Sequence, residues 1–275
     1  MTQLPIRLIA LDLDGTAIGP EQEFAPRAVR AVAEAQRRGI VVTLATGRSP
    51  VSTRPFAEAL NIHVPLICYQ GGLIAETDGR VLHRIALDRG LAAQVITLAE
   101  SRGWHVNLYQ DGLLYLTEFR HPTPFYEALL NPAAQCVPDL RPLLDHDPDK
   151  VIIVAEGNGD EIQAELRERF DGQMQIVRSH ELFIEANPPG VDKGRGLAWL
   201  AAHLGVPQSQ VMAVGDQDND APMVAWAGLG VAMGNASAAC KSVADWIAPP
   251  LSEDGAAVAI ERFALDDNHT DLDCQ

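Results

Sequence analysis

The chain has 275 residues, enough for one large domain or two smaller ones with a substantial core. Its composition, with 47% hydrophobic and 21% charged residues, is that of an ordinary globular protein. The formal net charge of −16 argues against nucleic acid or an anionic membrane surface as a partner. An anionic substrate would therefore need a local cation, supplied by the protein or by a metal.

The first part of the chain alternates strands and helices. Residues 6–11 form a run that is apolar apart from Arg7, typical of a parallel strand buried on both faces. A helix is expected over 25–38, where apolar residues recur at helical spacing. Further strands are expected within 40–47 and 64–72, with a second helix between them. This order predicts a parallel α/β sheet.

The middle of the chain has a different pattern. Two hairpins are expected, turning at the Asp-Gly pairs 78–79 and 111–112, with a helix over 88–102 between them. The stretch 121–149 is rich in proline and aspartate and predicts no clear element. A strand, a helix and one or two strands then follow, up to residue 186. This mixture predicts an α+β unit inserted into the first fold.

The alternation of strands and helices returns from Lys193 onward. We therefore divide the chain into a split core, residues 1–81 and 188–275, and an inserted unit, residues 82–187. The expected fold class is α/β, with a Rossmann-like parallel sheet in the core. Residues 266–275 are acidic and nearly devoid of apolar side chains, so we expect a disordered tail there.

The cysteines form neither a metal-binding nor a disulfide pattern. Cys68, Cys136, Cys240 and Cys274 lie far apart, with no CxxC motif and no His/Cys cluster, so we expect buried, reduced thiols. The first residues lack a basic region followed by a long apolar core. No apolar run is long enough to span a bilayer. We therefore expect a cytoplasmic protein that does not act at a membrane.

Polar clusters follow several strands of the predicted core. Asp12 and Asp14 end the first buried strand, where two desolvated carboxylates are costly unless something neutralises them. The segment 46–48, Thr-Gly-Arg, ends the second strand, and Lys193 follows the strand LFIEA. The segment 215–220, Gly-Asp-Gln-Asp-Asn-Asp, ends a late strand. Because ligands of open parallel sheets bind at the carboxyl ends of strands, we expect these clusters to meet at one edge.

The segments DLDGT, ATGR, GVDKG and GDQDND, in this order and spacing, resemble the four motifs of the haloacid dehalogenase superfamily. The inserted unit resembles the large α/β cap of the Cof-type sugar-phosphate phosphatases, and the resemblance covers nearly the whole chain. It implies Mg²⁺-dependent hydrolysis of a phosphate monoester of a small metabolite, such as a sugar phosphate. The reaction would pass through an aspartyl-phosphate.

The resemblance also implies roles for the aspartates. Asp12 would be the nucleophile, and Asp14 would act as general acid and base. Either residue alone could simply cap a turn, but two carboxylates at a buried strand end favour a reactive site. Asp12, the backbone carbonyl of Asp14 and Asp216 would bind Mg²⁺, a cation that prefers oxygen ligands.

The remaining motif residues would surround these groups. Thr46 and Lys193 would bind oxygens of the transferring phosphoryl group. Asn219 and Asp220 would hold metal ligands or waters in place. Arg48 either contacts the substrate or pairs with a nearby acid.

Two kinds of alternative stay open. Within the superfamily, the chain could be a phosphomutase or a phosphatase of a disaccharide phosphate. Outside it, the chain could be an aspartate-phosphorylated signalling protein or an inactive binding protein. Signalling receivers are about half this long, and no motif residue is missing, so an enzyme is favoured. Gln70 replaces an asparagine that the family often carries, which puts the usual leaving-group contacts in doubt. The sequence fixes neither the oligomeric state nor the exact substrate.

Overall fold

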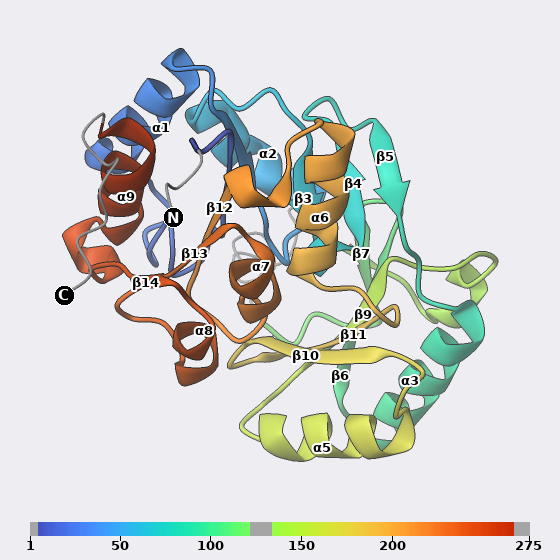
Figure 1. Cartoon of the computed structure of the whole chain (residues 1–275). Helices are drawn as coiled ribbons and strands as arrows, with labels where there is room; N and C mark the ends of the chain where they lie inside the picture. The colour runs from blue at the N-terminus through green and yellow to red at the C-terminus, as the bar shows by residue number, and fades with distance from the viewer. Residues whose placement is uncertain (1–4, 122–133, 267–275) are drawn as a thin grey trace.

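A computed structural model describes residues 5–121 and 134–266 (Figure 1). Its core is a five-stranded parallel sheet in the order β14-β13-β12-β1-β2. The strands are β1 (Leu8–Leu11), β2 (Val41–Leu44), β12 (Val211–Gly215), β13 (Leu229–Ala232) and β14 (Trp246–Ile247). Leu11 lies opposite both Leu44 and Val214, so β1, β2 and β12 end side by side. The residues that follow these strands therefore share one edge of the sheet.

Helices lie on both sides of this sheet, with α1 and α9 together on one side and α6 and α7 on the other (Figure 1). The core helices are α1 (Pro26–Arg37), α2 (Pro50–Ala59), α6 (Lys193–His203), α7 (Ala221–Trp226), α8 (Ala238–Ser242) and α9 (Gly255–Ile260). Helix α2 begins at Pro50, where the Ser49 side chain caps it by accepting a hydrogen bond from the Ser52 N–H at 3.2 Å. The predicted α/β core is thus confirmed.

A second, six-stranded sheet has the order β10-β11-β9-β6-β7-β8. It is antiparallel except for the pair β7-β8. Its strands are β6 (His105–Gln110), β7 (Leu113–Leu116), β8 (Ala134–Cys136), β9 (Lys150–Val154), β10 (Gln175–His180) and β11 (Phe183–Asn187), and its helices are α3 (Arg89–Arg102) and α5 (Gly159–Arg169). The hairpin β6-β7 turns at Asp111 and Gly112, as predicted. This unit is the cap.

The two faces of the cap sheet differ in chemistry. One face packs on α3 and α5 in an apolar cluster that includes Leu108, Ile153 and Ile184. Alternate residues of the same strands point the other way. They include Tyr109, Lys150 and Glu185, and they too are buried. A buried face with charged side chains needs partners for those charges, and the core supplies some of them.

A small antiparallel sheet joins the core to the cap. It contains β3 (Leu66–Cys68), β4 (Leu73–Ala75) and β5 (Val81–Arg84). The sequence predicts the third core strand here, and β3 meets the parallel sheet through a bridge between Ala45 and Ile67. Short turns complete the chain: the 3-10 turns Tyr69–Gly71, Arg141–Leu143, Gln208–Gln210 and Leu251–Glu253, and a π turn, Glu261–Leu265.

Expectations from the sequence also cover the cysteines and the C-terminal tail. Cys68 and Cys240 are buried free thiols, but Cys136 is exposed, because it ends the short cap strand β8; the expectation of buried thiols was wrong there. Cys274 and the predicted tail, apart from Asp266, lie outside the described residues. Within residues 5–121 and 134–266, no helix has the length and apolar character needed to cross a membrane.

Candidate active site

A cavity of about 1050 Å³ lies between the carboxyl edge of the core sheet and the charged face of the cap sheet. Every site residue predicted from the sequence lines it: Asp12, Asp14, Thr46, Arg48, Lys193, Asp216, Asn219 and Asp220. Cap residues close the other side, among them Tyr109, Lys150 and Glu185. The topology therefore brings segments from both ends of the chain to one place.

Lys193 lies between two aspartates at the base of the cavity. Its Nζ donates to Asp12 Oδ1 at 2.6 Å and to Asp220 Oδ1 at 2.5 Å, and all three side chains are buried. Helix α6 begins at Lys193 because Asp192 caps it, accepting from the Arg195 N–H at 2.8 Å. This hydrogen bond at the start of α6 fixes Lys193 at the edge of the sheet.

Burial and charge oppose each other at this contact. Burial lowers the pKa of Lys193, but the attraction of Asp12 and Asp220 outweighs it and raises that pKa above the ordinary value. The pKa of Asp12 is raised well above its usual range, first by burial and then by the charge of Asp220, while Lys193 opposes the rise. Lys193 is therefore a fixed cation at neutral pH, and it favours the ionised form of Asp12.

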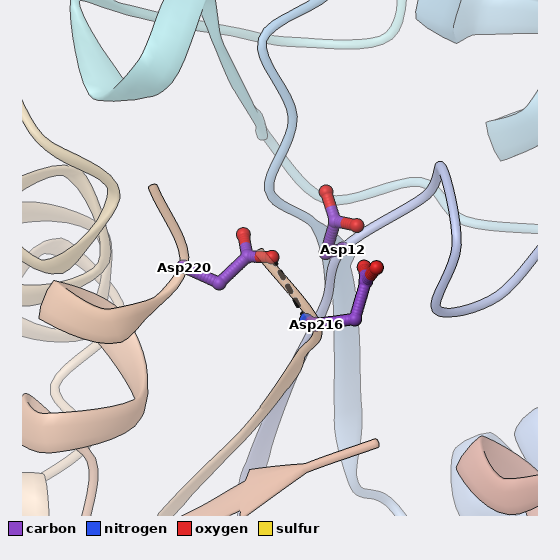
Figure 2. Close-up of side chains that lie close together, drawn as sticks. All are labelled: Asp12, Asp216 and Asp220. Atoms are coloured by element: carbon purple, nitrogen blue, oxygen red, sulfur yellow. Dashed lines mark hydrogen bonds between the residues drawn. The ribbon is translucent and has the colours of Figure 1, made fainter. Parts of the chain in front are cut away.

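Asp216 follows β12 and lies beside Asp12 (Figure 2). Its Oδ1 accepts from Thr16 Oγ1 at 2.8 Å, and its Oδ2 accepts from Gln217 Nε2 at 2.8 Å. Burial, then the charge of Asp220, raises the pKa of Asp216 to about 6. Asp220 is held in turn by the backbone N–H groups of Asp216 and Gln217, each 2.9 Å from its Oδ2.

These aspartates fit a hard divalent cation. Ligand oxygens of Asp12, Asp216 and Asp220 lie within 4.8 Å of one another. Asp220 is held by the Lys193 ammonium and two backbone N–H groups, whereas Asp216 accepts from the neutral side chains of Thr16 and Gln217, so Asp12 and Asp216 are the better ligands. Three buried carboxylates face the single charge of Lys193, which leaves negative charge for a metal to neutralise. Mg²⁺, which takes oxygen ligands and keeps several waters, suits this set.

Arg48 pairs with Asp14 at the mouth of the site. Its Nε donates to Asp14 Oδ2 at 2.8 Å, and its Nη2 donates to Oδ1 at 2.5 Å. The guanidinium carbon lies 4.9 Å from the centre of the Phe56 ring, and Gln22 accepts a further bond. Of the two roles left open by the sequence, the structure shows the pairing with an acid. Thr46 is buried next to it, with Oγ1 accepting from the Arg48 N–H at 3.1 Å.

Gln70, the departure from the family pattern, occupies a central place in the site. Its Nε2 donates to Glu185 Oε1 at 3.3 Å, and its Oε1 accepts from Asn219 Nδ2 at 2.9 Å. Its backbone is left-handed, with φ of 60°, a conformation that asparagine tolerates better than glutamine. The Gln70 amide thus joins Asn219 of the core to Glu185 of the cap, and an asparagine side chain at this position would be one methylene group shorter.

Lys150 and Glu185 line the cavity but were not singled out from the sequence. Lys150 Nζ donates to Glu185 Oε2 at 2.7 Å and lies 5.1 Å and 5.2 Å from the ring centres of Tyr69 and Tyr109. The sequence does contain one signal for these two residues. Each charge falls within a short, mostly apolar strand, KVIIV and FIEAN, where an ionised side chain needs a partner.

Comparisons with known proteins extend over nearly the whole chain. Residues 9–260 match the family of haloacid dehalogenase-like hydrolases. The chain is 32% identical to the 5-amino-6-(5-phospho-D-ribitylamino)uracil phosphatase YcsE of Bacillus subtilis, covering 94% of this chain and 96% of the relative. It is 31% identical to the HMP-PP phosphatase of Serratia proteamaculans, covering 86% and 87%. A crystal structure of a haloacid dehalogenase-like hydrolase from Bacteroides thetaiotaomicron, 31% identical, matches 94% of this chain and 99% of its own with a TM-score of 0.83. The similarity thus includes the cap as well as the core.

Proposed function

The chain belongs to the haloacid dehalogenase-like hydrolases and is a phosphatase, and from this premise we propose that it hydrolyses a phosphate monoester of a small metabolite, such as a sugar phosphate, with Asp12 as nucleophile. The observation that carries the proposal is the buried contact between Lys193 and Asp12, beside Asp216, at the end of β1. A cation there keeps the Asp12 carboxylate available and attracts a phosphate group in an otherwise acidic protein.

Two displacements at phosphorus account for the reaction. In the first, an Asp12 oxygen attacks phosphorus, the bond from phosphorus to the alcohol oxygen breaks, and Asp14 gives a proton to the departing alcohol. In the second, Asp14 takes a proton from water, the water oxygen attacks phosphorus, and the bond to Asp12 breaks. Inorganic phosphate and the free alcohol are released, and both aspartates return to their starting forms.

The phosphoryl oxygens need donors, and the chain offers two. Lys193 has a third N–H beyond its bonds to Asp12 and Asp220, and the Thr46 hydroxyl lines the same cavity. Both would bind oxygens whose negative charge is present throughout the transfer. Arg48 holds the Asp14 carboxylate in the cavity through two hydrogen bonds, and one of them must be given up when Asp14 carries the proton for the departing alcohol.

Mg²⁺ would be held by Asp12, the backbone carbonyl of Asp14 and Asp216, with Asn219 and Asp220 supporting that set. Bound there, the ion would supply positive charge that offsets the charge of the phosphate and of the clustered carboxylates. Burial first, and then the charge of Asp220, raises the pKa values of Asp12 and Asp216, and a cation bound there would oppose both effects.

The size of the site supports a small substrate. The cavity of about 1050 Å³ is covered by the cap and has room for a metabolite. The two relatives named above are phosphatases of small molecules by their names.

We also propose that the cap extends over residues 82–187 and the core over 1–81 and 188–275. A separate apolar cluster from Leu87 to Ala186 supports this division, and strand β5 lies across the first boundary.

A panel of phosphorylated metabolites, assayed for released phosphate with Mg²⁺ present, tests the proposal. Sugar phosphates and other small monoesters should be hydrolysed, and Asp12→Asn should abolish the release by removing the attacking oxygen anion. Release that persists in Asp12→Asn at the wild-type rate would rule out Asp12 as nucleophile. Hydrolysis of no ester in the panel by the wild-type protein would overturn the proposed function.

A further inference from the structure

The cap places an ion pair, Lys150–Glu185, against the catalytic loops of the core. The two side chains are 2% and 3% exposed, and their charged atoms are 2.7 Å apart. They come from neighbouring strands, β9 and β11, on the sheet face opposite α3 and α5. Such a pair gains little stability over apolar side chains of similar size, because desolvation offsets its attraction. Its presence therefore calls for a reason other than stability.

Lys150 reaches out of the cap to the core. Its Nζ donates to the backbone carbonyl of Gly47 at 2.9 Å. Gly47 stands between Thr46, which would bind the phosphoryl group, and Arg48, which holds Asp14. The ammonium thus fixes the middle of this loop from the cap side.

Glu185 reaches a second catalytic loop through Gln70. Its Oε1 accepts from Gln70 Nε2, which forces the Gln70 carbonyl oxygen to point the other way. That oxygen accepts from Asn219 Nδ2 at 2.9 Å. Asn219 belongs to the loop after β12, between Asp216 and Asp220. The orientation of two core amides therefore depends on a cap carboxylate.

We propose that Lys150 and Glu185 are positioning residues for the reaction at Asp12. Neither residue contacts the reacting atoms. Lys150 acts through Gly47 on the Thr46–Arg48 loop, and Glu185 acts through Gln70 on the Asp216–Asp220 loop. The inference rests on the proposed function, because it assigns these loops to phosphoryl transfer.

A double substitution separates positioning from stability. Lys150→Met with Glu185→Leu replaces the ion pair by apolar side chains of similar size, a change that is often neutral or stabilising for a buried pair. We expect the melting temperature to change little, because the desolvation cost that is removed offsets the lost hydrogen bonds to the Gly47 carbonyl and the Gln70 amide. We expect kcat to fall by about 10- to 100-fold, the size of effect that a misplacement of about 1 Å can produce.

The choice of substrate tests how the pair acts. If the pair positions the phosphoryl site, kcat should fall by the same factor for p-nitrophenyl phosphate and for phosphorylated metabolites, since all share the phosphoryl group. Binding of orthovanadate should weaken as well. The control is Arg102→Met with Glu165→Leu, which removes a more exposed pair between α3 and α5 that is also 2.7 Å apart and lies away from the cavity. It should leave kcat unchanged.

A single substitution gives an independent test should the double variant fail to fold. Gln70→Asn keeps a residue suited to the left-handed backbone but shortens the side chain, so it cannot join Glu185 to Asn219. We expect kcat to fall about 10-fold and KM to change less than 3-fold. A fall of this size is typical of a catalytic group that is misplaced rather than removed.

Three results would overturn the inference. Full kcat in the double variant or in Gln70→Asn would show that the pair does not position the site. Loss of activity toward metabolites alone, with p-nitrophenyl phosphate unaffected, would make the pair a leaving-group site instead. With either of these two results, turnover by the wild-type protein would still support the proposed function. A wild-type protein that hydrolyses no phosphate ester would overturn the proposed function and this inference together.

Discussion

Gly15 lies against the carboxylate of Asp216, so closely that a Cβ atom on Gly15 would stand 2.4 Å from Asp216 Oδ2. Its φ of +92° is also one that residues with a side chain rarely adopt. The turn after Asp14 therefore needs glycine for two reasons, and one of them concerns the site itself. No substitution at Gly15 leaves Asp216 where it is.

Gly15→Ala should consequently abolish Mg²⁺ binding and lower kcat at least 100-fold, because Asp216 must move out of the metal site. Titration calorimetry with Mg²⁺ and a phosphatase assay measure the two effects. Gly39→Ala is the matched control, since Gly39 also has a positive φ of 79° but no atom within 4 Å of an added Cβ. The control should lose about 1 kcal/mol of stability and keep its activity. Equal losses of activity in both variants would contradict the proposed role of the contact.

The Asp12→Asn and Asp14→Asn variants should lose phosphatase activity at different steps of the reaction. Asp14→Asn keeps the backbone carbonyl and removes the proton transfer, so turnover should fall by roughly 10²–10⁴-fold. A substrate with a good leaving group needs little protonation, so p-nitrophenyl phosphate should still phosphorylate Asp12. Water must then attack without its base, and phosphoenzyme should accumulate.

Rapid-quench mass spectrometry checks that difference. The Asp14→Asn protein should carry a phosphate on the peptide that contains Asp12, and Asp12→Asn, the control, should carry none. A phosphate on another residue would remove Asp12 from the mechanism.

Chelation should stop the enzyme reversibly. With EDTA, hydrolysis of p-nitrophenyl phosphate should vanish, and added Mg²⁺ should restore it, because the carboxylates of Asp12 and Asp216 need a cation between them. Ca²⁺ should inhibit, since its higher and looser coordination disturbs the alignment of the transferring group. Asp216→Asn should need more Mg²⁺ for half-maximal activity. Undiminished turnover in excess chelator would exclude the metal role.

His105 should make the stability of the cap depend on pH. Its pKa is lowered from 6.5 to about 4, first by burial and then by the charges of Arg120 and His121. Between these values the unfolded chain binds a proton that the folded chain does not. Stability is therefore complete above pH 6.5 and is lost as the pH falls toward 4. From pH 7 to 5, the wild-type melting temperature should fall roughly 4–8 °C further than that of His105→Gln, the shift expected for about 2 kcal/mol. Parallel curves for the two proteins would contradict this assignment.

Most of the core was predictable because its signals are local. The apolar run before Asp12 and the helical spacing before Arg37 each identify an element without reference to the rest of the chain. The rule that ligands bind at the carboxyl ends of parallel strands then groups Asp12, Thr46 and Asp216. The structure does bring these residues to one cavity.

The cap side of the site was not predictable in the same way. Lys150 and Glu185 are far apart in sequence from the loops they contact, and no motif marks them. Their partners depend on how the cap sheet is oriented on the core, which local patterns do not specify. Gln70 was noticed as a departure, but its contact with Glu185 joins residues 115 positions apart. Arg48 was ambiguous because pairing with an acid and binding a substrate need the same side chain.

The pairing of β1 with β12 also constrains the order in which the protein can form during synthesis. Thr16 and Asp216 share a hydrogen bond but are 200 residues apart, so β1 has no neighbour on that side until the last quarter of the chain leaves the ribosome. The strands from β6 to β11 pair among themselves and can complete their ladders earlier. During that interval the nascent core exposes an apolar strand edge open to wrong pairing. The predicted nucleophile, Asp12, is thus among the first residues made and among the last to meet its partners.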